Sequence, residues 1–460
     1  MLNDKESPFT LTLTTSGLIL PVLRFDGEEA LNQPYRFDVE LIGLAPAIPP
    51  GALLQQQAFL RLDSRHGVHG VIHSASCEHR GTHRVGYRLE LVPHLHGLAA
   101  PGKRRVFVQL SVPQILQRLL ENALPSGNYR IETTVGHYPV RPFCIQYEES
   151  DLALLQRLCE EEGIHYHFEH RPDGHVVVFA DDSLSLPQSP TLLPFEADEP
   201  TPSPRISSLY QQHHGAPVVP LHAVRNRGQQ AGGEAAANQT ATNPQPLSTS
   251  PAQRHAEQRS RRHLERQRCQ QRSVHGRSDC VSLLSGHLLQ VLEHPLSQFN
   301  EQWLITHLQH HGQHPSILEP ASTAHRYYND FTAQPWSTDF RPPLKQRRPG
   351  IAGYHLAQVS GIPGRPAQLD EHGRMAVTLW PEHGEPCDAS ATLWLPIAMT
   401  RASSRISADD LPCAGSEVWV SFLDGDPDRP ILCLADSRQP PPRDITHNDD
   451  LLLDWLMNAP

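Results

Sequence analysis

Histidines are the first candidates for chemistry in this sequence, which has 29 of them among 460 residues. They include two closely spaced groups: His66, His69 and His73, and then His307, His310, His311 and His314. Residues two apart in a strand share a face, so some of these pairs would suit zinc or nickel. No carboxylate or cysteine completes a recognisable ligand spacing, so we expect surface histidines rather than a metal site.

Consecutive carboxylates are the next candidates. Glu160, Glu161 and Glu162 follow one another, and paired carboxylates are common agents of general acid and base catalysis. Consecutive positions on a helix point in different directions, so these side chains do not converge on one substrate. We expect them to form a solvated or interface face.

A third candidate is a run of alternating aspartates. Asp424, Asp426 and Asp428 have the spacing of carboxylates in a calcium-binding loop. Pro427, Pro430 and the lack of a distal glutamate favour a tight turn instead.

The sequence contains none of the common catalytic or phosphate-binding motifs that we searched for, which were GxSxG, HExxH, the P-loop and GxGxxG. We therefore expect no catalytic, cofactor-binding or metal-binding residue. The same reasoning predicts that the protein is not an enzyme and needs no cofactor.

The strongest local pattern, at 147–182, contains the three glutamates. Ser150 is a suitable N-cap, leucines recur after it at helical spacing, and Gly163 provides a left-handed stop. The glutamates crowd the helix end, where the macrodipole disfavours acidic groups. Strict alternation over 164–169 and a Pro-Asp-Gly turn then predict a β-hairpin. The sequence thus predicts a capped helix that feeds a hairpin and buries its apolar stripe against a sheet.

Much of the remaining chain alternates between apolar and polar residues, as strands do. Clear examples are 9–14, 35–41 and 87–93, and a short helix is indicated at 112–120. Five short strands within 354–438, with turn residues at each break, predict a small closed barrel of OB type. The expected fold class is therefore mainly β with short helices (α+β).

The composition changes over 211–277, where aromatic residues vanish and Gln, Ala, Ser, Arg and His dominate. Within this segment, 255–271 is a candidate basic, polar helix. We weigh two interpretations of it: a solvated helix or partly disordered insertion, and a docking surface for an acidic partner.

Four runs carry a family resemblance: Gln146-Tyr147-Glu148-Glu149-Ser150-Asp151, Glu161-Glu162-Gly163-Ile164, Asp370-Glu371-His372-Gly373-Arg374 and Gly425-Asp426-Pro427-Asp428-Arg429-Pro430. They resemble the VgrG family, the trimeric spike of the type VI secretion system, which is similar to hub and needle proteins of contractile phage tails. The resemblance implies hub β-barrel domains followed by the OB-type barrel. The family usually continues into a long β-helix needle, but nothing repetitive follows here, so we expect no needle.

The resemblance and the composition together suggest a division into domains. We expect a first hub β-barrel region at 1–145, a second hub region with the helix–hairpin unit and the polar insertion at 146–345, the OB-type barrel at 351–438, and a proline-rich linker with an apolar tail at 439–460. The tail is dense in apolar side chains, namely Leu451, Leu452, Trp455, Leu456 and Met457. We expect it either to dock on the trimer, an effector or an adaptor, or to be the stub of a longer region.

Composition limits the partners and the compartment. A net charge of −11 argues against a general nucleic-acid binder. The N-terminus has no signal-peptide pattern, and no stretch approaches the roughly 20 apolar residues of a membrane span. The eight cysteines form no CxxC pair, so we expect reduced thiols and a protein made in the cytosol.

The resemblance then implies a function. We expect a homotrimer on a hexameric tube beside baseplate proteins, which aids membrane puncture and effector delivery and meets the target membrane only during injection. It would assemble in the cytoplasm and be secreted, without a signal peptide, into the target cell or the medium. Two alternatives stay open: a baseplate, adaptor or phage-tail-like hub protein without a needle, and a spike with its own enzymatic effector activity.

Overall fold

The structure, a computed structural model, describes residues 9–80, 83–196, 203–215, 251–314, 326–381, 392–398 and 411–434. Strands predominate among these residues, so the predicted mainly β fold class is confirmed. The chain forms two compact units, called the hub unit and the terminal unit below. The hub unit comprises Met1–Ala100, Ser111–Val140 and Ser150–Arg347, and the terminal unit comprises Pro101–Leu110, Arg141–Glu149 and the chain from Arg348 onward.

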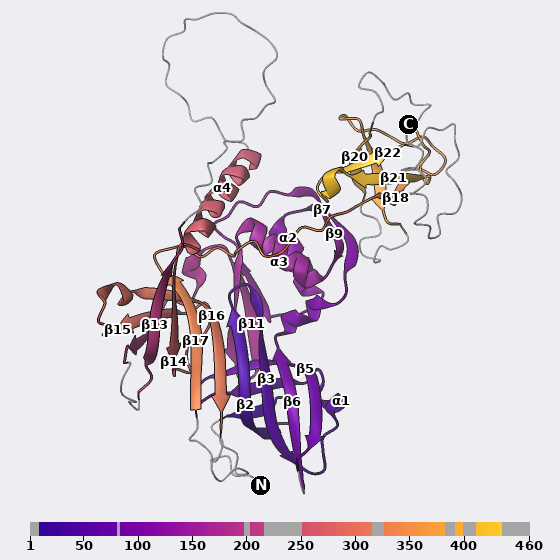
Figure 1. The fold of residues 1–460 in the computed structure, drawn as a ribbon. Helices are drawn as coiled ribbons and strands as arrows, with labels where there is room; N and C mark the ends of the chain where they lie inside the picture. Colours follow the sequence, from indigo (N-terminus) through magenta and orange to yellow (C-terminus); the bar gives the residue numbers. More distant parts are fainter. Residues whose placement is uncertain are drawn as a thin grey trace, which may run out of the picture. The chain divides into compact units, whose positions relative to one another are not determined.

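A closed barrel of six antiparallel strands forms the first part of the hub unit (Figure 1). Its strands are β1 (Thr10–Leu13), β2 (Ile19–Ala30), β3 (Gln33–Leu44), β4 (Gln57–Arg61), β5 (Gly67–His79) and β6 (Arg84–Val92), with α1 (Pro50–Leu53) between β3 and β4. They pair in the order β1-β4-β5-β6-β3-β2, and β1 also pairs with β2, which closes the ring. Alternation along each strand drives this closure, because it gathers residues such as Phe25, Tyr35 and Phe37 into a fully buried core.

The sheet continues from β2 into the second part of the hub unit. The added strands are β16 (Gln302–Gln313), β17 (Arg326–Pro335), β14 (Arg272–Ser278), β13 (Ile206–His213), β15 (Leu288–Leu292) and β12 (Thr191–Pro194). Trp303 is fully buried in their core, and its indole N–H donates to the Phe299 carbonyl at 3.0 Å. β13 and β14 pair directly with each other, so the polar segment 211–277 starts and ends in one hairpin. That segment contains α4 (Pro251–Cys269), whereas 216–250 lie outside the described residues.

The predicted capped helix and hairpin are both present. α3 (Asp151–Glu162) begins at Ser150, whose Oγ accepts the Ala153 N–H at 3.1 Å, and it ends at Gly163, where φ is 71°. β10 (His165–Arg171) and β11 (Gly174–Ala180) form the hairpin, and β8 (Tyr129–Glu132) pairs with β11 in parallel. α3 packs against α2 and η1. Other helical elements are α2 (Val112–Glu121), η1 (His94–Ala99), η2 (Ser183–Ser185), η3 (Ser297–Phe299) and η5 (Leu423–Gly425).

The terminal unit contains the predicted OB-type barrel. Its strands are β18 (Tyr354–Val359), β19 (Arg374–Leu379), β20 (Leu393–Pro396), β21 (Glu417–Phe422) and β22 (Pro430–Cys433). They pair in the order β20-β19-β18-β21-β22. A parallel bridge between Ile397 and Leu432, with the Ala398 N–H donating to the Leu432 carbonyl at 2.7 Å, joins the ends of this row. The five strands thus close in the connectivity of an OB barrel.

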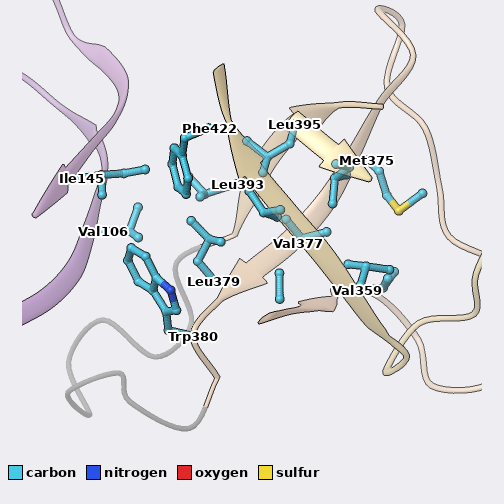
Figure 2. Close-up of a cluster of buried hydrophobic side chains, with 14 of the residues drawn as sticks. Val106, Ile145, Val359, Met375, Val377, Leu379, Trp380, Leu393, Leu395 and Phe422 are labelled. Carbon is cyan, nitrogen blue, oxygen red and sulfur yellow. The ribbon is translucent and has the colours of Figure 1, made fainter. Parts of the chain in front are cut away.

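Two strands from early in the chain also belong to the terminal unit. β7 (Lys103–Leu110) and β9 (Arg141–Glu149) form an antiparallel ribbon, and their Val106 and Ile145 pack with Leu379, Trp380 and Phe422 of the barrel (Figure 2). A two-stranded ribbon is only marginally stable alone, so it needs such a partner. The division expected from the sequence placed both strands in the hub regions 1–145 and 146–345, and the structure differs from it here. The expected apolar tail, 439–460, lies outside the described residues.

Candidate functional site

The first histidine group found in the sequence does not converge on one point. The His66 ring lies 2.9 Å from a carboxylate oxygen of Asp63, His69 is fully buried, and His73 is exposed beside His96. These three side chains therefore have different surroundings and do not form a ligand set.

The second histidine group lies along β16 and splits between its faces. His307 and His311 pair with carboxylates of the neighbouring β2, at 3.0 and 2.7 Å. His310 is buried, and its Nε2 lies 3.4 Å from the buried carboxylate of Glu29. Within the part of the chain that the structure describes, no group of three or more His, Cys, Asp or Glu side chains could hold a metal ion.

A different set of histidines comes together, and the sequence analysis missed it. His69 on β5, His94 on η1, and His170 and His175 on the β10–β11 hairpin form a cluster where the hairpin meets the barrel. The rings of His94 and His175 stack, with centroids 4.7 Å apart, and Tyr35 packs edge-on against His170 at 4.9 Å. No local sequence signal marks the cluster, because it depends on strands being covered on both faces, which the alternation of residues does not show.

Hydrogen bonds fix the protons of this histidine cluster. The backbone N–H of His94 donates to Nε2 of His175 at 3.0 Å, so a neutral His175 carries its proton on Nδ1. That Nδ1 lies 3.1 Å from Nδ1 of His69, which must then accept. Burial, the first cause in each case, lowers the pKa of His69 to about 4 and that of His175 to about 2. His69 and His175 are therefore a neutral hydrogen-bonded pair, which is a structural arrangement rather than an acid–base site.

The aspartate run forms the predicted tight turn. Asp424 has a positive φ of 56° and its carboxylate pairs with Arg429 at 2.9 Å. Asp426 accepts the Asp428 N–H at 3.0 Å, and Asp428 pairs with Arg348 at 3.0 Å. Arg348 also lies 4.0 Å from Asp426, so the three carboxylates are bound within the turn and to two arginines. The predicted tight turn is present.

The glutamate run was expected to form a solvated or interface face, and the solvated alternative is wrong for two of its residues. Glu160 and Glu162 are only 5% and 1% exposed. One oxygen of Glu160 accepts the N–H groups of Lys345 and Gln346, both at 2.8 Å. Burial raises the pKa of Glu160, although these hydrogen bonds act against the shift. Glu162 lies 2.9 Å from the ring of His255 on α4.

The basic helix α4 corrects the expectation of a solvated helix on one of its faces. Gln258, Arg262 and Arg266 are buried and lie four residues apart, so they share a face. Arg262 donates to the carbonyl oxygen of Glu162, and Arg266 donates to that of Glu160 at 2.6 Å. The acidic end of α3 is thus the internal partner of this face. Docking of an outside acidic partner on the opposite face stays a prediction.

We expect Gly163→Ala to destabilise the hub unit by about 1–2 kcal/mol or more. The residue has a φ of 71°, and a Cβ at this position would lie 2.9 Å from Cδ of Arg262. Urea unfolding measures the effect, with Gly174→Ala as the control, because Gly174 has open space around it and no left-handed φ. Equal losses in both variants would contradict the steric argument.

The outer face of the terminal barrel carries a row of apolar side chains. Apolar residues on the outward positions of β18, β21 and β22 are Tyr354, Leu356, Trp419, Ile431 and Cys433, called the outer row below. The other outward positions of β18 and β21 are the polar Gln358, Glu417 and Ser421. Leu356 pairs with Trp419 and Trp419 with Cys433, so the row crosses three adjacent strands. Tyr354 is 67% exposed and Trp419 is 39% exposed. A contiguous exposed apolar patch of this kind usually marks a protein–protein contact.

Most of the chain is similar to known proteins. Residues 28–316, more than half of it, match the phage tail baseplate hub (GPD) family. The chain belongs to this family. This chain is 35% identical to the type VI secretion system spike protein VgrG5 of Pseudomonas aeruginosa. The match covers 96% of this chain, called the hub chain below, and 59% of that relative. VgrG4b of the same organism is 34% identical, over 96% and 58%. The expected resemblance to VgrG proteins is confirmed.

Solved structures show the same fold. An E. coli component of the type VI secretion system, described as similar to the T4 tail proteins gp27 and gp5, superposes with a TM-score of 0.70 at 23% identity. The match covers 92% of the hub chain and 98% of that chain. A Francisella PdpA–VgrG complex gives 0.56 at 8% identity, over 94% and 78%.

Three further facts bear on function. The hub chain spans about three fifths of the length of the first two relatives, so their whole activities do not transfer to it directly. A 28% identical relative is the actin cross-linking toxin VgrG1 of Vibrio cholerae, of which the hub chain covers 40%. No helix among the described residues is long and apolar enough to cross a membrane.

Proposed function

We propose that this chain is the hub and tip portion of a type VI secretion spike, with a mechanical rather than a catalytic role. The observation that carries the proposal is the succession of a closed six-stranded barrel and an OB-type barrel in one chain that is 35% identical to a spike protein. Closed barrels leave few free strand edges, which suits a stiff body that transmits force.

We infer that the active form is a homotrimer whose contacts include the outer row. Tyr354 and Trp419 expose aromatic surface on a small barrel, and aromatic anchors of this kind dominate binding energy at protein interfaces. Threefold assembly would cover this surface in all three copies.

The assembly test is a mass measurement on the intact chain in solution. We expect a mass three times the 51.4 kDa of one chain. Trp419→Ser is expected to weaken association by about tenfold or more, because it removes a central aromatic contact. Tyr210→Ser is the control, since Tyr210 is an exposed aromatic residue of the hub unit. A wild-type monomer would contradict the spike and favour an adaptor protein.

The proposal extends to partners and location. The trimer would sit on a hexameric tube among baseplate proteins, assemble in the cytoplasm, and pass into the target cell or the medium during injection without a signal peptide. Effectors or adaptors would attach through the apolar segment with Leu451, Leu452, Trp455, Leu456 and Met457, which lies outside the described residues. Deletion of 445–460 should abolish effector co-purification, and unchanged co-purification would contradict this attachment.

The alternative functions are a baseplate, adaptor or phage-tail-like hub protein without a needle, and a spike with its own enzymatic activity. The Vibrio relative named as an actin cross-linking toxin keeps the second alternative in view, but this chain covers less than half of that relative. In the described residues the candidate carboxylates are engaged in structural hydrogen bonds and ion pairs, which favours the mechanical role.

A further inference from the structure

α4 lies in a connection that the sheet does not need. β13 and β14 pair directly, with His213 opposite Arg272, so a tight turn would be enough to join them. The chain instead makes a long excursion over 214–271 that includes α4. The pairing of β13 with β14 therefore does not account for α4, whose contacts lie elsewhere in the hub unit.

One face of α4 is built to bind backbone. Gln258 both accepts the His137 N–H, at 2.6 Å, and donates to the His137 carbonyl, at 3.2 Å. Arg262 donates to the Glu162 carbonyl and, at 3.1 Å, to the hydroxyl of Tyr138. Gln258 and Arg262 thus bond mainly main-chain atoms and the Tyr138 hydroxyl, while His255 and Glu265 of the same helix pair with the side chains of Glu162 and Arg341.

The same face caps the end of α3. The last carbonyls of a helix lack intrahelical partners and carry the negative end of its dipole. Arg262 and Arg266 supply guanidinium donors to the carbonyls of Glu162 and Glu160. This explains how α3 tolerates an acidic last turn.

The segment that leaves the hub unit is held at this same place. Nε of Arg266 donates to the Pro342 carbonyl at 2.7 Å, and the Glu160 carboxylate accepts the Lys345 and Gln346 N–H groups at 2.8 Å. Arg341 pairs with Glu265 of α4 at 2.7 Å. Residues 341–346 are therefore fixed between α3 and α4 just before Arg348, where the chain enters the terminal unit.

We propose that α4 is a latch, which clamps residues 341–346 onto the end of α3. Arg266 is the central positioning residue, because one guanidinium bridges the α3 terminus and the exiting chain. Without the latch, residues 341–346, called the exit segment below, would open locally while the six-stranded barrel of the hub unit stayed folded. The latch is a property of the single chain, and only its use under mechanical load rests on the proposed spike function.

Limited trypsin digestion tests the latch, since Lys345 and Arg347 are cleavage sites at the exit segment. Cleavage in a folded protein requires local opening. We expect the double variant R262A/R266A to be cut there about tenfold faster or more, as judged by mass spectrometry of the fragments. R259A is the control, because Arg259 is an exposed residue of the same helix. Amide hydrogen exchange at Lys345 and Gln346 gives a second readout.

If the double variant fails to fold, Glu160→Gln tests the latch instead. It keeps the size of the side chain but weakens the acceptor for the two N–H groups, so faster exchange and cleavage are expected there as well. Unchanged cleavage in folded R262A/R266A, or in E160Q if the double variant is unfolded, would overturn the latch. A monomeric chain with a closed latch would refute the spike assembly alone, so the two proposals fail separately.

Discussion

Lowering the pH from 7 to 5 is expected to destabilise the hub unit severely, by as much as about 10 kcal/mol. Five histidines are held neutral in the folded chain: the buried His69, His165, His167 and His175, and the half-buried His170, whose two ring nitrogens are shielded from solvent. Their pKa values lie far below the ordinary 6.5, because burial penalises the charged ring. A loss of this size would equal the whole stability of a typical domain.

The sign follows from proton counting. Burial lowers the pKa of His170 to about 4, so between pH 6.5 and 4 the unfolded chain binds a proton that the folded chain does not. The free energy of unfolding therefore rises with pH across this window and falls as the solution is acidified. Each such histidine contributes at most about 1.4 kcal/mol per pH unit, or about 2 kcal/mol between pH 6.5 and 5.

The contact between His69 and His175 is where acidification is expected to disrupt the packing first. The two Nδ1 atoms of His69 and His175 lie 3.1 Å apart and share one proton. A second proton places two N–H groups against each other inside a dry contact, which pushes the β10–β11 hairpin away from β5. The charged groups that act on the five histidines are Glu29, Glu169, Asp173, Arg130, Arg341 and, when protonated, other histidines.

The nearby carboxylate does not reverse this dependence. Burial raises the pKa of Glu29, but the hydrogen bond and charge of His310, the charge of His170 and the Ser285 N–H together leave it below the ordinary 4.5. The stability that the ionised Glu29 contributes is thus lost only below about pH 4.5, outside the range from pH 7 to 5.

Urea unfolding at pH 7, 6 and 5 measures the effect. His175→Gln should flatten the dependence by roughly one histidine, because glutamine still accepts the His94 N–H but does not titrate in this range. His372→Gln should not, since that residue is exposed on a turn of the terminal unit. A free energy of unfolding that is constant from pH 7 to 5 would contradict the prediction.

The sequence predicted what is decided locally. The N-cap at Ser150, the stop at Gly163 and the alternation after it all depend on neighbouring residues, and the structure contains them. The burial of Glu160 and Glu162 depends instead on Arg266 and Arg262, about 100 positions away in a segment that looked like a solvated insertion. Nothing in the local pattern shows that such charges will meet.

The prediction of surface histidines was wrong for a related reason. Alternation assigns His165 and His167 to the polar face of a strand, and that face is normally solvated. In the folded chain both faces of β10 are covered, and both rings are buried. The sequence therefore predicted the strand correctly but not what packs on its second face.

Ile145→Ala is expected to destabilise the terminal unit by about 2–5 kcal/mol and to leave the hub unit largely unchanged. Ile145 lies on β9, far from the barrel in sequence, yet it is 1% exposed and belongs to the core formed with Val106, Leu379 and Trp380 (Figure 2). Its truncation leaves a cavity in that core. A domain boundary drawn near residue 145 or 146 would predict the loss in the hub unit instead.

Hydrogen exchange under increasing urea separates the two outcomes, because peptides from the barrel strands and from β2 or β16 report on different units. Ile362→Ala is the matched control: it removes the same atoms from a side chain that is 60% exposed in the terminal unit. We expect earlier opening of β18–β22 in the Ile145 variant only. Earlier opening of β2 and β16, with the barrel unaffected, would show that β9 stabilises the hub unit. Matching effects of both substitutions would mean that the contact between the ribbon and the barrel contributes little.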